Sequence, residues 1–162
     1  MTVKSLAVRL AAMTTIAVAG GLIAAAVPAA AATEAAPYCA TDVQTHKSAC
    51  GDSEAQAAQL AGVAKASVLA VTLYDGINYS GASYSFYVTK DCTAGYEGEY
   101  GNPNLGAFSN KASSVHTYHH CDVHLHDPIN YGTPYSVWID QSANLANIGN
   151  GWNDRASSIG VS

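Results

Sequence analysis

The chain has little positive charge and none of the short sequence signatures of catalysis. Only seven of its 162 residues are Lys or Arg, and the formal net charge is -5. Contacts to phosphate groups need cations, so this composition argues against nucleic-acid binding. No nucleophile elbow, Gly-rich phosphate loop, dinucleotide fingerprint or His-Glu-x-x-His sequence occurs. We therefore expect a binding protein and not an enzyme.

A long apolar run occurs near the start of the chain. Lys4 and Arg9 precede small apolar residues at 10–27, and 30–32 is an Ala triplet suited to cleavage. This arrangement is typical of a secretory signal peptide over residues 1–32. A membrane anchor is the weaker alternative, because the run is mostly Ala and no basic anchor follows it. We expect a secreted protein with no membrane association after cleavage, and a mature net charge of about -7 from five basic and twelve acidic residues.

Four cysteines remain after the predicted cleavage, and an even number in an exported chain indicates two disulfides. Three connectivities are possible. Cys39–Cys50 and Cys92–Cys121 are favoured because each pair stays within one segment of the chain. The spacing matches no common zinc motif.

Composition divides the remaining chain at residue 68. Residues 33–67 are rich in Ala and Gln and predict a leader with a small Cys39–Cys50 loop and a helix over 54–66, which Ser53 and Gln56 would cap. A docked leader, a pro-segment and a flexible spacer all remain open. Residues 68–162 contain short alternating runs separated by Gly, Asn and Pro, which predict an all-β sandwich. The positions expected to share strand faces are Val71 with Leu73; Tyr84, Phe86 and Val88; Val115 to Tyr118; Val123 with Leu125; and Tyr135, Val137 and Ile139.

Two blocks each occur twice in this second part. Residues 73–79 (LYDGINY) return as 125–131 (LHDPINY), and residues 109–115 (SNKASSV) return as 153–159 (NDRASSI). The blocks alternate along the chain, so they predict two similar structural units.

These blocks resemble the βγ-crystallins. The motif of that family, an aromatic, four residues, an aromatic, any residue and Gly, corresponds to Tyr74, Tyr79 and Gly81. Microbial members add a calcium signature of two Asn/Asp, two variable residues, Ser/Thr and Ser. Residues 153–158 match it throughout, and residues 109–114 match it except at Ser109. The resemblance covers residues 68–162 and implies a two-Greek-key β-sandwich.

In that family each calcium ion lies between a hairpin and two signature loops that exchange arms. The resemblance therefore implies one or two calcium sites in a secreted structural or stress module. Calcium requires six to eight oxygen ligands. One site is expected to be weaker, because Ser109 replaces Asn/Asp, and the second hairpin has His126 for an aromatic and lacks one residue before Gly132. The implied ligand positions are Asp75, Asn110, Ser113, Asp127, Asn153, Asp154 and Ser157.

The sequence is also similar to secreted bacterial metalloproteinase inhibitors, which share this fold. This similarity implies an alternative function, inhibition of an extracellular metalloprotease. The nearest candidate for an inhibitory loop contains Cys92, Thr93, Ala94, Gly95 and Tyr96.

Five histidines gather between residues 116 and 126. His124 and His126 alternate on one strand face, a spacing that suits zinc, copper or nickel. A polar strand face is the alternative interpretation.

Overall fold

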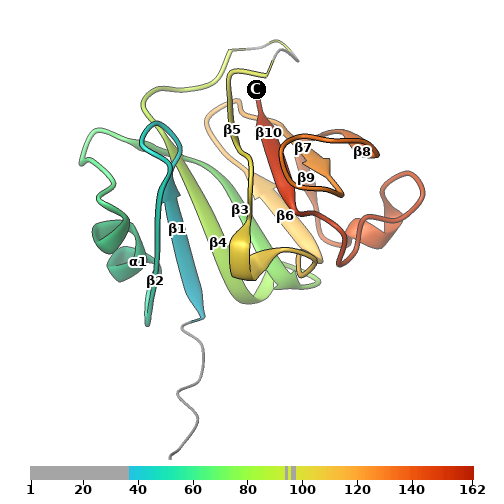
Figure 1. The fold of residues 1–162 in the computed structure, drawn as a ribbon, viewed down its shortest axis with the longest axis horizontal. Coiled ribbons are helices and arrows are strands. Elements are labelled where there is room, and N and C mark those ends of the chain that lie inside the picture. Colours follow the sequence, from blue (N-terminus) through green and yellow to red (C-terminus); the bar gives the residue numbers. More distant parts are fainter. Residues whose placement is uncertain (1–36, 94, 96–97) are drawn as a thin grey trace, which may run out of the picture. The chain divides into compact units, whose positions relative to one another are not determined.

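The computed structural model describes residues 37–93, 95 and 98–162, which belong to one compact unit. The predicted signal peptide lies outside these residues. The described residues form a six-stranded sheet in the order β2-β1-β4-β3-β6-β9 and a four-stranded sheet in the order β5-β10-β7-β8 (Figure 1). No helix in this part of the chain is long and apolar enough to cross a membrane.

The elements follow one another in short steps. The strands are β1 (Tyr38–Asp42), β2 (Lys47–Gly51), β3 (Val68–Gly76), β4 (Ser80–Val88), β5 (Tyr100–Asn102), β6 (Ser114–Thr117), β7 (Val123–His126), β8 (Tyr135–Ile139), β9 (Gln141–Ser142) and β10 (Ser158–Val161). The helices are α1 (Glu54–Ala61) and two 3-10 turns, η1 (Gly106–Phe108) and η2 (Leu145–Asn147).

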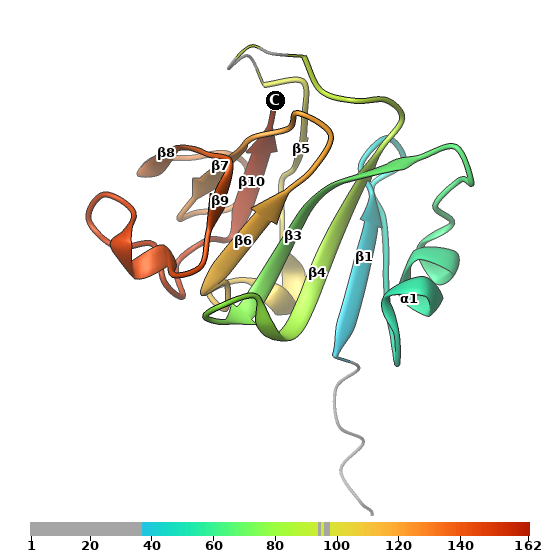
Figure 2. The ribbon, with the colours of Figure 1, turned by 180° about the vertical axis from the view of Figure 1, so that it is seen from behind.

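The two repeated units are interlocked by an exchange of strands. The first unit sends β5 to the four-stranded sheet, where it pairs with β10 of the second unit. The second unit sends β9 to the six-stranded sheet, where it pairs with β6 of the first. Figure 2 shows β6 beside β3 from the opposite side. The all-β sandwich of two units that the sequence predicted is confirmed.

The core lies between strand faces that the alternating pattern identified. Val71, Leu73 and Phe86 are fully buried in one sheet, and Val123 and Leu125 are fully buried in the other. The aromatic residues before the two signature loops, Phe108 and Trp152, belong to the same apolar cluster. Burial of these side chains fixes the loops that follow them.

Of the three residues predicted to share one face of β8, only Ile139 is buried. Tyr135 and Val137 are 55% and 66% exposed, whereas Ser136 between them is buried. The register between β7 and β8 shifts between His124 and His126, so β8 holds an extra residue at that point. Such a bulge reverses which side chains point inward. Ser136 uses the inward position to accept a hydrogen bond from the Leu125 amide through its Oγ, at 2.9 Å.

The described part of the leader, residues 37–67, is docked onto the six-stranded sheet. β1 pairs with β2 in an antiparallel hairpin and runs parallel to β4, and α1 packs on this hairpin with Ala57 and Ala61 against Ala40. The helix begins as predicted, since Ser53 accepts a hydrogen bond from the Gln56 amide. It ends at Ala61 and not at residue 66, because Gly62 adopts a left-handed conformation that closes the last turn.

Two disulfides are present, in the pairing that the sequence favoured. Cys39–Cys50 joins directly opposed residues of β1 and β2. Cys92–Cys121 joins the segment after β4 to the β6–β7 connection.

Candidate functional site

The two signature loops, residues 109–114 and 153–158, meet and exchange backbone hydrogen bonds. The Asn110 amide donates to the Ala156 carbonyl at 2.8 Å, and the Asp154 amide donates to the Ala112 carbonyl at 2.9 Å. Asn110 and Asp154 have φ values of 59° and 54°. Asn and Asp tolerate this left-handed conformation better than most residues, which explains their presence at the turning point of each loop.

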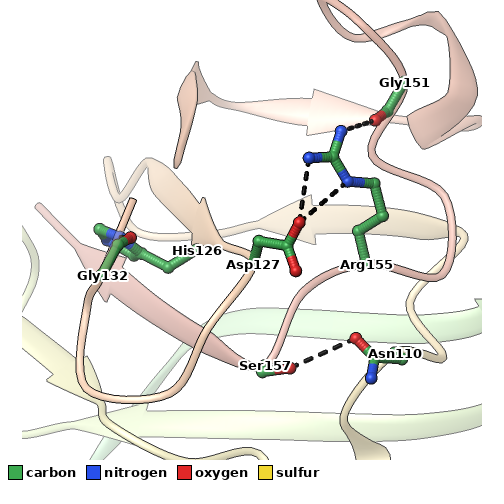
Figure 3. A network of polar contacts seen from close by, with 7 residues as sticks. All are labelled: Asn110, His126, Asp127, Gly132, Gly151, Arg155 and Ser157. Carbon is green, nitrogen blue, oxygen red and sulfur yellow. Dashed lines mark hydrogen bonds and ion pairs between the residues drawn. The ribbon is translucent and has the colours of Figure 1, made fainter. Parts of the chain in front are cut away.

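This exchange pairs the serine of each loop with the Asn or Asp of the other. Ser113 Oγ donates to Asp154 Oδ1 at 3.2 Å, and Ser157 Oγ donates to Asn110 Oδ1 at 3.3 Å. Figure 3 shows the second pair, with the two side chains pointing toward each other. Each pair places two side-chain oxygens from distant parts of the chain at one point.

Each pair is also held against its own hairpin. The Ser113 amide donates to the Tyr74 carbonyl at 2.7 Å, and the Ser157 amide donates to the His126 carbonyl at 2.8 Å. We therefore define the first site as Ser113 and Asp154 beside the first hairpin (residues 74–81), and the second site as Ser157 and Asn110 beside the second hairpin (residues 126–132).

The last serine of each signature loop, Ser114 or Ser158, holds the adjacent hairpin by hydrogen bonds. The sequence pattern did not reveal this role. Ser114 Oγ donates to the Gly76 carbonyl at 2.6 Å and accepts from the Tyr79 amide at 3.0 Å. Ser158 Oγ repeats this arrangement in the second hairpin with the carbonyl of Pro128 and the amide of Tyr131. Both serines are fully buried.

Asp75 and Asn153 make local contacts. Asp75 Oδ1 accepts from the Ala82 amide at 2.7 Å and thereby closes the first hairpin. Gly81 is necessary beside it, because a Cβ there would overlap that carboxylate oxygen. Asn153 Nδ2 donates to Asp154 Oδ2 at 2.7 Å and so orients the carboxylate of the first site.

Asp127 has a different partner from its counterpart Asp75. Its Oδ2 accepts from Arg155 Nη2 at 3.0 Å and from Nε at 3.4 Å. Arg155 also donates through Nη1 to the Gly151 carbonyl at 2.7 Å, and its guanidinium lies 4.5 Å from the centroid of Trp152. Figure 3 shows this ion pair above Ser157. The pattern did not single out Arg155, because it fills a variable position of the signature.

In the second hairpin, His126 takes the position of the leading aromatic residue and contacts the far end of the hairpin. His126 is 7% exposed, and its Nδ1 lies 3.0 Å from the Gly132 carbonyl, which bridges the hairpin. In the first hairpin, Tyr74 packs edge-on against Tyr79 at 5.9 Å. Burial, reinforced by a hydrogen bond with Tyr118, raises the pKa of Tyr74, so this side chain is neutral at physiological pH.

The histidines between residues 116 and 126 lie in β6, in β7 and in the turn that joins them. Within residues 37–93, 95 and 98–162, no three His, Cys, Asp or Glu side chains form a group that could hold a metal ion. The His124 and His126 rings lie 4.9 Å apart, and His124 stacks on Trp138 at 4.7 Å. These rings form an aromatic cluster between β7 and β8.

The candidate inhibitory loop is only partly described, since Ala94 and Tyr96 lie outside the described residues. Cys92 is buried in its disulfide with Cys121. The hydroxyl and amide of Thr93 both donate to Glu99 Oε1. The loop is thus closed at its base.

Three comparisons relate the chain to known proteins. No family model and no curated protein matches it. Among solved structures, the chain is similar to a βγ-crystallin domain from Flavobacterium johnsoniae, with 24% identity and a TM-score of 0.41 over 57% of this chain and 93% of that one. It is similar to a βγ-crystallin from an archaeon, with 20% identity and a TM-score of 0.41 over 57% and 96% of the two chains. A βγ-crystallin domain from Clostridium beijerinckii gives 20% identity and a TM-score of 0.42 over 57% and 95%.

Proposed function

We propose that this protein is a secreted calcium-binding module of the βγ-crystallin type, with a structural or stress role and no catalytic activity. The observation that supports it is the crossing of the two signature loops, which pairs Ser113 with Asp154 and Ser157 with Asn110. The predicted signal peptide and the two disulfides support secretion.

The donor set suits calcium at the first site. Calcium prefers oxygen ligands and tolerates a mixture of carboxylate, hydroxyl, carbonyl and water. Ser113 and Asp154 offer hydroxyl and carboxylate oxygens, and the first hairpin adds backbone carbonyls nearby. Softer metals would demand His or Cys, and the described residues gather no such group. A bound calcium ion would supply positive charge that links the two crossed loops.

The test is calorimetric titration of calcium into the demetallated protein, together with thermal melting. If calcium is present at a thousandfold over Kd, binding adds about 4 kcal/mol to the free energy of unfolding. For a domain of this size the melting temperature should rise by about 12–16 °C relative to chelator. Asp154→Asn should abolish most of this rise, whereas the matched charge change Asp52→Asn, at an exposed position in the β2–α1 connection, should leave it intact. Equal melting temperatures in calcium and chelator would reject the proposal.

The second candidate is inhibition of an extracellular metalloprotease. The observation that favours it is the closed base of the 92–99 loop, formed by the Cys92–Cys121 disulfide and the Thr93–Glu99 contacts. A loop constrained in this way loses less entropy when it enters a protease cleft. Titration of a thermolysin-like enzyme tests it, and full protease activity at micromolar protein would exclude it.

A further inference from the structure

The two sites have equivalent backbones but different charges. Hydrogen bonds that hold Ser113 to Tyr74 and the Asp154 amide to Ala112 have direct counterparts in the second site. The side-chain partner of the serine, however, is the carboxylate Asp154 in the first site and the neutral amide Asn110 in the second. Calcium affinity depends strongly on the number of charged ligands. The second site therefore starts one negative charge short.

The second site also carries a cation of its own. Arg155 reaches the hairpin carboxylate Asp127 with two nitrogens, and a third nitrogen is held by the Gly151 carbonyl. Contact with the Trp152 ring fixes the guanidinium from another side. Four contacts from three residues make this a preorganised cation, unlike a freely moving surface side chain.

Among the residues that the structure describes, the first site has no equivalent arrangement. Lys111 occupies the position that corresponds to Arg155, but it is exposed. Asp75, the counterpart of Asp127, directs its carboxylate to the Ala82 amide of its own hairpin. The two sites therefore differ at two positions of each loop, Asn110 against Asp154 and Lys111 against Arg155.

We propose that Arg155 is a built-in cation that takes the place of the second calcium ion, so that the protein binds a single calcium at the Ser113–Asp154 site. This inference rests on the proposed function, since it concerns the same pair of loops. The guanidinium neutralises Asp127 and repels a divalent ion near Ser157 and Asn110. The second site is thus stabilised without metal, and only the first site depends on calcium.

The test compares Arg155→Gln with Lys111→Gln by calorimetric titration of calcium into the full-length purified protein. Both variants remove one positive charge, so a general change in electrostatic potential would affect them equally. The wild type and Lys111→Gln should bind one ion. Arg155→Gln should bind two ions, the second at the Ser157–Asn110 site.

Melting temperature provides an independent readout. In chelator, Arg155→Gln should melt about 2–4 °C below the wild type, because a half-exposed ion pair is lost. The rise in melting temperature from chelator to calcium should be larger for Arg155→Gln than for the wild type. Adding Asn110→Ala to Arg155→Gln should remove the second ion again.

The outcomes separate this inference from the proposed function. Two ions of similar affinity in the wild type, or one ion in Arg155→Gln, would overturn the inference while leaving calcium binding in place. No ion in the wild type but one in Arg155→Gln would reject the proposed function and support the role of Arg155. Absence of binding in both proteins would overturn both.

Discussion

Replacement of Gly81 by Ala tests how the first hairpin is held beside its site. Gly81 has a φ of 83°, and a Cβ there would overlap Asp75 Oδ1, the acceptor for the Ala82 amide. An L-residue with positive φ costs about 1–2 kcal/mol. Displacing the partly solvated carboxylate should cost about 1 kcal/mol more. The total, about 2–3 kcal/mol, corresponds to a fall in melting temperature of about 8–12 °C.

Gly106→Ala is the matched control, because Gly106 has a φ of 57° and a Cβ added to it would meet no atom within 4 Å. The Gly106→Ala variant should lose only the free energy that an L-residue costs at positive φ. It should therefore melt about 4 °C above Gly81→Ala. The assay is thermal unfolding in chelator, followed by circular dichroism.

A double-mutant cycle isolates the overlap between a Cβ at position 81 and the Asp75 carboxylate. In an Asp75→Ala background, Gly81→Ala should cost no more than Gly106→Ala, since the obstructing oxygen is gone. If Gly81→Ala and Gly106→Ala are equally stable in the unmodified background, the carboxylate moves aside freely, and the reasoning about Asp75 is refuted.

Three further predictions concern stability. Replacing Cys92 and Cys121 by Ser should cost about 3–4 kcal/mol in urea unfolding, because the disulfide spans 29 residues; a loss under about 1 kcal/mol would contradict this chain-entropy argument. Ser114→Ala should cost about 2 kcal/mol, since it leaves one carbonyl and one amide of the first hairpin without their hydroxyl partner; the exposed replacement Ser80→Ala should be much milder, and equal effects would count against the tie. Burial, and secondarily the neighbouring histidine, lower the pKa of His124, so folding favours the neutral ring. The stability that the neutral His124 ring contributes is present above the ordinary His pKa of about 6.5 and is lost as the pH falls below it. His124→Gln should therefore flatten the dependence of the unfolding free energy on pH between about pH 7 and pH 5. Parallel curves of unfolding free energy against pH for the two proteins would exclude His124 as the source of the dependence.

Local patterns in the sequence predicted much of the fold. Alternation of Val71 with Leu73 and of Tyr84 with Phe86 identified strand faces that the structure buries. Strand faces repeat every two residues, so this information is present in the chain itself. The bulge in β8 was not predictable in this way, because the extra residue is defined only by the strand that β8 pairs with.

The hairpin of β1 and β2 was also not predictable from local sequence patterns. β1 (Tyr38–Asp42) combines two residues that favour strands, Tyr38 and Thr41, with Ala40 and Asp42, which do not, so its sequence gives no strong strand signal. Its conformation is determined by pairing with β4, which lies more than forty residues later in the chain. The Cys39–Cys50 pair was visible in the sequence as a local link, but not as a link between opposed strands.

The repeated blocks by themselves determined that two alike loops exist and which side chains they carry, because a repeat is a property of residue order. Only the tertiary structure decided that the loops cross, so that Ser113 meets Asp154 and Ser157 meets Asn110. It also decided that Arg155 turns toward Asp127 whereas Lys111 stays in solvent. The physical reason is that contacts between segments depend on the three-dimensional position of both partners, and no spacing along one segment records the position of the other.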